Sequence, residues 1–218
     1  MKIKSAVGAA LLVSVFHSPN SFAAGSGATD IAAPPAFFAK EFGDTLPPVG
    51  YVKFCAANPA ECVSYSFSEK LASARIKMNP SRWNQLYQVN TSVNRKIAPV
   101  TDQELYGVAE NWTYPATAGD CEDYLLLKKR ELETMGFPPK ALRITVVLQE
   151  KGEGHAVLTV TSNEGDYVLD NRRNEIMLWT DTNYTFLKRQ ADNDPRHWVS
   201  LLNKQGLAAA AVSSSRKP

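Results

Sequence analysis

The chain has 218 residues, of which 44% are hydrophobic and 21% charged, and it carries 24 Lys and Arg against 22 Asp and Glu. This near-neutral balance, with its basic residues scattered, argues against a nucleic-acid partner. The length is enough for one domain with a sizeable core.

The first 23 residues have the pattern of a secretory signal peptide. Lys2 and Lys4 precede an apolar stretch that ends near Phe16, and small residues lead to a cleavage point after Ala23. No other segment reaches the roughly 20 apolar residues that a membrane helix needs. Without residues 1–23 the chain keeps 22 basic and 22 acidic residues, and we expect it to be periplasmic or secreted.

Composition divides the rest of the chain into three parts. Residues 24–50 are rich in Gly, Ala, Ser and Pro and predict an extended segment, whose Phe side chains are candidates for docking on the domain. Residues 51–205 form the predicted domain. Residues 206–218 end in Ser, Arg, Lys and Pro and predict a flexible tail.

Two helices are marked by their start and stop signals. Asn79 and Pro80 fit a cap and a first helical residue, and apolar residues then follow at steps of three and four as far as Ile97. A second helix is predicted from Asp120 to about Met135, where a glycine and two prolines stop it.

Strands are predicted after the second helix. Residues 142–148 and 155–161 are β-branched and alternate in polarity, and residues 167–170 follow a turn signal. The segment 65–78 shows no assignable pattern. A helix followed by antiparallel strands predicts an α+β fold.

The three cysteines divide into a pair and a single thiol. Cys55 and Cys62 are close enough in sequence to form a disulfide across a small loop, as an exported protein would allow. Cys121 then remains free. The alternative is three unrelated buried cysteines, since free cysteine is among the most buried residue types.

Cys121, His155 and Asp170 stand in the order nucleophile, base and orienting carboxylate. A free thiol is mostly protonated near neutral pH, an imidazole can take its proton, and a carboxylate fixes the imidazole tautomer. Cys121 would lie in the first turn of a helix, where the macrodipole favours a thiolate. Taken singly, each residue also has an ordinary structural explanation, because capped helices and turn aspartates are common.

The predicted strands place one condition on this triad. His155 begins one strand and Asp170 ends the next, so a hairpin brings both to the same end of the sheet. A tight turn at residues 164–165 would put Asp170 nearer Thr159 than His155. Contact therefore requires a longer loop or a bulge.

Several short runs of this chain occur together in one known family. They are Trp83-Asn84-Gln85-Leu86, Val89-Asn90, Val93-Asn94, Asn111-Trp112, Gly119-Asp120-Cys121-Glu122-Asp123-Tyr124, His155-Ala156-Val157-Leu158 and Val168-Leu169-Asp170-Asn171. Over most of its mature length the chain resembles the bacterial transglutaminase-like cysteine peptidases, the family of LapG-like periplasmic proteases.

The resemblance implies a papain-like, transglutaminase-type core, with the nucleophile at a helix N-terminus packed on an antiparallel sheet. It also implies that Cys121, His155 and Asp170 form the catalytic triad. Glu122 stands where papain has Trp, and no Gln lies just upstream, so the second oxyanion donor is unassigned. Trp112 and Asn171 are the candidates for the substrate groove and oxyanion site.

Family resemblance further implies calcium near the acidic run and a membrane-bound regulator. Asp120, Glu122 and Asp123 are the candidate ligands, because carboxylate oxygens suit calcium. The alternative is a helix N-terminus stabilised by acidic residues with no metal. No cofactor is required for the chemistry itself.

The sequence therefore predicts an exported cysteine endopeptidase that acts through a thioester on cell-envelope or adhesin-type proteins. Two alternatives stay open: an acyltransferase or amidase with the same triad, and a catalytically silent module that binds peptides. A monomer is favoured, although the oligomeric state is unknown.

Overall fold

The computed structural model describes residues 37–66, 68 and 73–214. The predicted signal peptide and residues 24–36 of the predicted N-terminal segment lie outside this range. In the described part of the chain, no helix is both long enough and apolar enough to cross a membrane.

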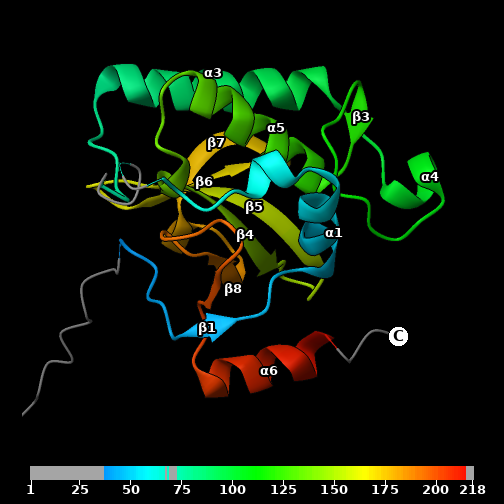
Figure 1. Cartoon of the computed structure of the whole chain (residues 1–218). Helices are drawn as coiled ribbons and strands as arrows, with labels where there is room; N and C mark the ends of the chain where they lie inside the picture. The colour runs from blue at the N-terminus through cyan, green and yellow to red at the C-terminus, as the bar shows by residue number, and fades with distance from the viewer. Residues whose placement is uncertain (1–36, 67, 69–72, 215–218) are drawn as a thin grey trace, which may run out of the picture. The chain divides into compact units, whose positions relative to one another are not determined.

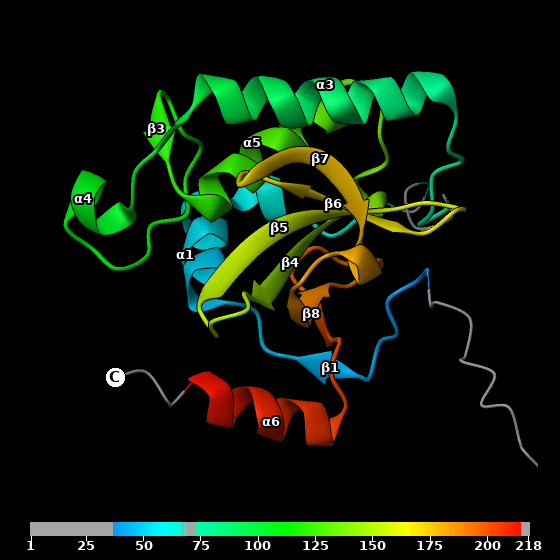
Figure 2. The same cartoon turned by 180° about the vertical axis from the view of Figure 1, so that it is seen from behind.

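The elements follow one another as mixed helices and strands (Figures 1 and 2). The helices are α1 (Val49–Ala57), α3 (Pro80–Lys96), α4 (Asp102–Tyr106), α5 (Cys121–Thr134) and α6 (Lys204–Ser214), with short 3-10 turns η1 (Pro59–Cys62), η2 (Pro139–Ala141) and η3 (Trp179–Asp181). The strands are β1 (Asp44–Thr45), β2 (Ala98–Pro99), β3 (Ala118–Gly119), β4 (Leu142–Leu148), β5 (Gly154–Thr161), β6 (Asp166–Asp170), β7 (Arg173–Leu178), β8 (Thr185–Gln190) and β9 (Trp198–Ser200).

Helices α3 and α5 cover one face of an antiparallel sheet whose order is β1-β9-β8-β4-β5-β6-β7 in the described residues (Figures 1 and 2). Leu86 of α3, Leu125 of α5 and Leu158 of β5 are almost fully buried in the same apolar cluster. This arrangement confirms the predicted α+β fold, with the N-terminus of α5 packed on the sheet.

The local signals of the sequence are borne out in the two long helices. The Asn79 side chain accepts a hydrogen bond from the Arg82 amide at 2.8 Å, and Pro80 is the first residue of α3. At the end of α5 the chain turns at Gly136, which has a φ of +80°. Glycine adopts this backbone conformation more readily than other residues do.

The β5–β6 turn is longer than the tight turn considered from sequence. Thr161 pairs with Asp166 and Leu158 with Leu169, so four residues connect the strands. Continuing this register puts Asp170 opposite Val157, which brings it two positions closer to the start of β5 than the tight turn would. The required longer loop is therefore present.

Short edge elements were missed because they carry little periodic signal. Strands β1 and β9 have 2 and 3 residues, respectively, and pair with other strands of the sheet.

Residues 206–214, which are part of the predicted flexible tail, are helical and belong to α6. The run of alanines after Leu207 explains this difference, because alanine has the highest helix propensity.

The predicted disulfide is present. Cys55 near the end of α1 is bonded to Cys62 at the end of η1, with a Cα–Cα separation of 5.5 Å. The bond closes the loop between these two elements, and Cys121 remains as the free thiol.

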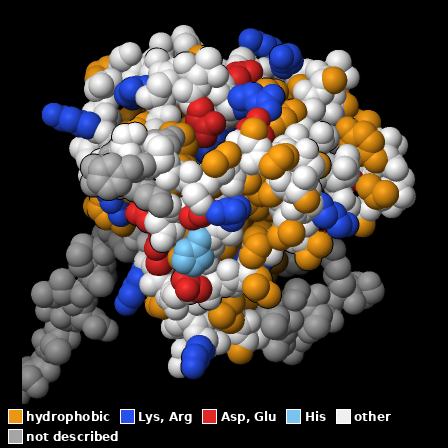
Figure 3. Space-filling model, viewed as in Figure 1, with side chains coloured by type: hydrophobic (Ala, Val, Ile, Leu, Met, Phe, Trp, Pro, Cys, Tyr) orange, Lys and Arg blue, Asp and Glu red, His pale blue; other side chains and the backbone are white. Residues whose placement is uncertain are grey.

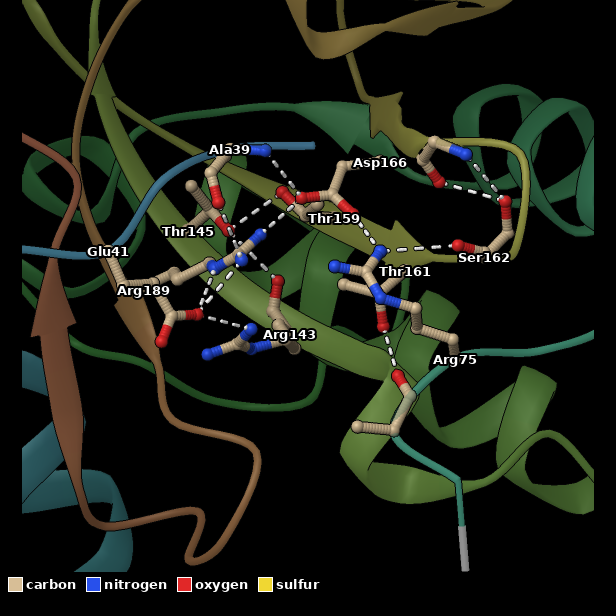
Figure 4. A network of polar contacts seen from close by, with 12 residues as sticks. Ala39, Glu41, Arg75, Arg143, Thr145, Thr159, Thr161, Ser162, Asp166 and Arg189 are labelled. Carbon is tan, nitrogen blue, oxygen red and sulfur yellow. Dashed lines mark hydrogen bonds and ion pairs between the residues drawn. The ribbon is translucent and has the colours of Figure 1, made fainter. Parts of the chain in front are cut away.

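A buried ionic network holds the N-terminal segment on the sheet (Figure 4). Arg189 Nη1 lies 2.7 Å from Asp166 Oδ2, which also accepts a hydrogen bond from the Ala39 amide. The Glu41 carboxylate pairs with Arg189 at 2.9 Å and with Arg143 at 2.7 Å. The charged side chains of this network therefore pair with one another and with the backbone of the N-terminal segment.

Replacing Asp166 with Ala should lower the free energy of unfolding by about 3–5 kcal/mol, because it removes the fully buried partner of the Arg189 guanidinium. Urea denaturation would measure the loss. Asp44→Ala is the control, since it removes an exposed partner of His197 and should cost less than about 1 kcal/mol. Equal losses in the two variants would contradict the interpretation.

Candidate active site

Cys121 is the first residue of α5, and its thiol lies against the strand that carries His155. The Ala156 amide of β5 donates a hydrogen bond to Cys121 Sγ, and the sulfur lies 3.0 Å from Glu122 Oε2. The helix begins here because Asp120 is extended at the N-cap position, while two acidic residues in the first turn complement the helix dipole. The structure thus places the thiol one residue from His155 along β5.

The surroundings of the thiol favour its protonated form. Burial raises the pKa of Cys121 well above its ordinary value, and the charge of Glu122 and the hydrogen bond to it raise the pKa further. The Ala156 amide acts in the opposite direction. A group that accepts the proton, or a cation near the acids, is therefore needed to form a thiolate.

His155 and Asp170 form a buried hydrogen-bonded pair. His155 Nε2 lies 2.9 Å from Asp170 Oδ1, and the two residues are 6% and 1% exposed. His155 stands at the start of β5 and Asp170 at the end of β6, so the pair joins the same end of two neighbouring strands. Because Nε2 faces the carboxylate, Nδ1 is the nitrogen left for proton transfer. Contact between His155 and the Cys121 thiol stays a prediction.

The Asp170 carboxylate is held in its charged form by several donors. Burial alone would raise the pKa of Asp170, but the hydrogen bond and charge of His155, with hydrogen bonds from Tyr184 and the Arg172 amide, lower it to about 2. Tyr184 donates to Oδ2 at 2.6 Å, and Arg173 Nε lies 3.6 Å from the same oxygen. Sequence reasoning missed Tyr184, because an isolated tyrosine before a strand carries no catalytic signal.

Helix α3 fixes the turn that carries Asp170. Asn94 Nδ2 donates to the carbonyl oxygens of Asp170 and Arg173, each at 2.9 Å. Asn90, one turn earlier, donates to the Arg173 carbonyl and accepts from the buried Lys128 ammonium at 2.7 Å. These contacts give a structural reason for the two asparagines of the runs Val89-Asn90 and Val93-Asn94.

An acidic cluster lies at the start of α5 and contains one residue that the sequence did not indicate. Asp102, Asp120 and Asp123 bring their carboxylates within 4.8 Å of one another. The parallel pairing of β2 with β3 places Asp102 beside Asp120. Gly119 is also required, since a Cβ there would lie 2.5 Å from Asp123 Oδ2. No local pattern connects Asp102 with residues eighteen positions later.

Each carboxylate of this cluster has one bonded and one unbonded oxygen. Backbone amides of Asn111, Asp102 and Thr113 donate to Asp102, Asp120 and Asp123, respectively. The other three oxygens are buried and have no hydrogen-bond partner among the described residues. Burial and the charges of Asp120 and Asp102 raise the pKa of Asp123 to about 7, although the Thr113 amide opposes this. Three neighbouring carboxylates that each keep a buried oxygen without a donor suit a hard cation such as calcium.

Other predicted site residues occupy different surroundings. Glu122 lies against the Cys121 thiol and forms, with Cys121 and Asp120, a second group whose possible ligand atoms lie within 4.8 Å of one another. Its predicted role as a calcium ligand stays a prediction. Trp112 is 7% exposed and packs on Tyr51 in the core, so little of its ring is left for substrate. Asn171 has a buried side-chain oxygen without a partner among the described residues. Groove and oxyanion roles for Trp112 and Asn171 stay predictions.

The sequence profile of the bacterial transglutaminase-like cysteine proteinases, BTLCP, matches residues 41–206. The chain belongs to this family. It is therefore a cysteine peptidase, and Cys121 is its free cysteine. The match spans the elements from the N-terminal segment at Glu41 to the start of α6.

Solved structures similar to the peptidase include Legionella pneumophila LapG. The calcium-bound form has 23% identity and a TM-score of 0.48, covering 62% of this chain and 81% of that one. Another LapG structure has 20% identity and a TM-score of 0.46, covering 78% and 98%. No curated protein sequence matches the peptidase.

Replacing Asp170 with Asn should remove a pH-dependent part of the stability of the peptidase. The folded pKa of about 2 lies below the ordinary 3.8, so this contribution exists above about pH 4 and is lost as the pH falls through 2. The difference in unfolding free energy between wild type and variant should be about 2 kcal/mol larger at pH 6 than near pH 2. Chemical denaturation at several pH values would measure it, and a constant difference would contradict the assignment.

Proposed function

We propose that the peptidase is an exported endopeptidase in which Cys121, His155 and Asp170 form the catalytic triad. The observation that supports this most directly is the buried hydrogen bond between His155 and Asp170, beside a strand whose next amide donates to the Cys121 thiol. In this proposal a nucleophile, a base and an orienting carboxylate from three different elements meet at one end of the sheet.

The first half of the reaction forms an acyl-enzyme. His155 Nδ1 takes the proton from Cys121 Sγ, and the sulfur attacks the peptide carbonyl carbon. Backbone amides at the start of α5, which lack helical partners, are suited to stabilise the oxyanion. His155 then passes the proton to the leaving amine, the C–N bond breaks, and a thioester to Cys121 remains.

The second half restores the free enzyme. His155 takes a proton from water, the resulting hydroxide attacks the thioester carbonyl, and the C–S bond breaks. The proton returns to the sulfur and the carboxylic acid product leaves. Asp170 keeps one orientation of the imidazole through both halves, since its carboxylate stays hydrogen-bonded to Nε2.

Membership of a proteinase family favours hydrolysis over acyl transfer and over a silent binding module. The signal peptide predicted from residues 1–23 supports action in the periplasm or outside the cell, on protein or peptide substrates of the envelope.

Hydrophobic side chains gather over α1 and α4 (Figure 3), including the exposed Val49, Val52 and Val108. Surface patches of this kind are typical of protein contacts. A membrane-bound regulator stays a prediction.

Replacing Cys121 with Ala should abolish peptide cleavage, and Asp170→Asn should lower kcat by about 10²–10⁴-fold, because it removes the group that orients the base. New protein N-termini in envelope fractions, compared with and without each variant, would measure cleavage and reveal the substrate. Both variants should keep the fold, as judged by circular dichroism. Undiminished cleavage by Cys121→Ala would refute the triad.

We also propose that Asp102, Asp120 and Asp123 bind calcium. Their three unbonded, buried oxygens support this. The proposed set has Asp102 where the set inferred from sequence has Glu122. A bound calcium ion would supply positive charge that offsets the carboxylates at the start of α5. The residues around it orient the carboxylates through backbone amides, which keeps the unbonded oxygens converging.

Calcium at about 100 times its dissociation constant should stabilise the wild type by about 2.7 kcal/mol. Asp102→Asn should lose most of this gain, because it removes a charged ligand, whereas Glu122→Gln should keep it. Thermal unfolding with calcium and with a chelator would measure both variants. Loss of the calcium effect in Glu122→Gln alone would instead favour the ligand set inferred from sequence.

A further inference from the structure

We propose that Tyr184 is a positioning residue of the catalytic pair and closes it off from the adjoining cavity. This inference rests on the proposed roles of His155 and Asp170. Tyr184 lies between η3 and β8, in a segment that belongs to neither element. Its side chain contacts both members of the pair, which come from two other strands.

The Tyr184 hydroxyl completes the hydrogen bonding of the Asp170 carboxylate. It donates to Oδ2 at 2.6 Å, while Oδ1 faces His155 Nε2 at 2.9 Å. With one oxygen held by each partner, the plane of the carboxylate is fixed. Without the hydroxyl, the side-chain donor left near Oδ2 among the described residues is Arg173, whose Nε is 3.6 Å away. That distance is too long for a good hydrogen bond.

The Tyr184 ring contacts the imidazole directly. The two rings are 5.6 Å apart with an interplanar angle of 65°, an edge-to-face arrangement. Such pairs prefer a defined geometry, so the ring restricts rotation of the His155 side chain. One residue therefore orients the base through its ring and the acid through its hydroxyl.

Tyr184 is itself held by its neighbours. Its ring packs against the second apolar cluster of the sheet, which contains the buried Phe186 and Val168. The Arg173 guanidinium lies 5.6 Å from the ring centre. These packing contacts hold the Tyr184 ring in place, with its hydroxyl directed toward Asp170.

A cavity of about 490 Å³ adjoins this tyrosine. Tyr184, Arg172, Arg173 and residues of the β4–β5 turn line it, whereas His155 and Asp170 do not. Tyr184 is thus the residue that contacts both His155 and Asp170 and also lines the cavity, so its ring is suited to keep cavity water away from the pair. Exclusion of water strengthens the interaction between a carboxylate and an imidazole.

Tyr184→Phe should lower kcat about tenfold and change KM less than twofold, because it removes one hydrogen bond to a charged group and keeps the ring. Tyr184→Leu should lower kcat further, since it also opens the pair to the cavity. A quenched-fluorescent peptide that the wild type cleaves would serve as substrate. Titration of the reactive thiol gives kcat per folded active site, so partial unfolding does not contribute.

Tyr114 provides a matched control. Its hydroxyl donates to the Glu61 carboxylate at 2.7 Å, and the Arg130 guanidinium lies 3.1 Å from its ring centre. Tyr114→Phe thus removes the same type of hydrogen bond beside the same type of cation, away from the catalytic pair. Its kcat should equal that of the wild type.

Alkylation of Cys121 by iodoacetamide gives a second measurement that needs no substrate. Tyr184→Phe should react more slowly than the wild type near neutral pH, where the thiol depends on His155, and equally fast at high pH, where it ionises unaided. The groups that face Asp170 are His155, Tyr184, Arg172, Arg173 and Lys128, and only Tyr184 differs between the two proteins.

The outcomes separate this inference from the proposed function. Cleavage that needs Cys121, together with an unchanged kcat and alkylation profile in Tyr184→Phe, would overturn the role of Tyr184 and leave the triad intact. Cleavage that persists in Cys121→Ala would overturn the triad itself. An equal loss of kcat in Tyr184→Phe and Tyr114→Phe would show an effect that is not specific to the His155–Asp170 pair, and would also overturn the inference.

Discussion

The hydrogen bond between His155 and Asp170 is the contact on which the site depends, and it follows from the register of two strands. The four-residue turn between β5 and β6 places Asp170 opposite Val157, within diagonal reach of His155. The Asn94 amide then holds the Asp170 carbonyl from α3. A shift of one residue would turn the carboxylate to the other face of the sheet. The length of the β5–β6 turn, the packing of α3 and the contact between His155 and Asp170 therefore depend on one another.

The carboxylates of Asp170 and of the aspartates at the start of α5 are stabilised in different ways. Asp170 has hydrogen-bond donors on both oxygens, so its buried carboxylate stays ionised. The aspartates at the start of α5 each lack a donor on one oxygen, and the nearby Glu122 raises the pKa of the thiol. The first arrangement is complete within the protein, whereas the second leaves three buried carboxylate oxygens without a donor among the described residues. A bound cation and an oriented imidazole would both favour the thiolate.

Sequence reasoning succeeded where the signal is local. Caps and periodicity defined α3 and α5, alternation defined β4 to β6, and the order of Cys121, His155 and Asp170 indicated a triad of which the structure joins the last two. It could not find Asp102, which reaches the acidic cluster through the two-residue strand β2, or Tyr184, which reaches Asp170 across the sheet. Both depend on tertiary packing of short segments, and neither residue type is unusual for its local sequence.

The position of the thiol follows from where the β5–β6 ladder stops. The last pair of the β5–β6 ladder is Leu158 with Leu169, so Ala156 pairs with Val146 of β4 on one side and has no strand partner in β6 on the other. Its amide donates to Cys121 Sγ. A backbone donor that would otherwise need a strand partner is satisfied by the sulfur. Because His155 directly precedes Ala156 in β5, the amide that binds the sulfur also determines how near the thiol lies to the predicted base.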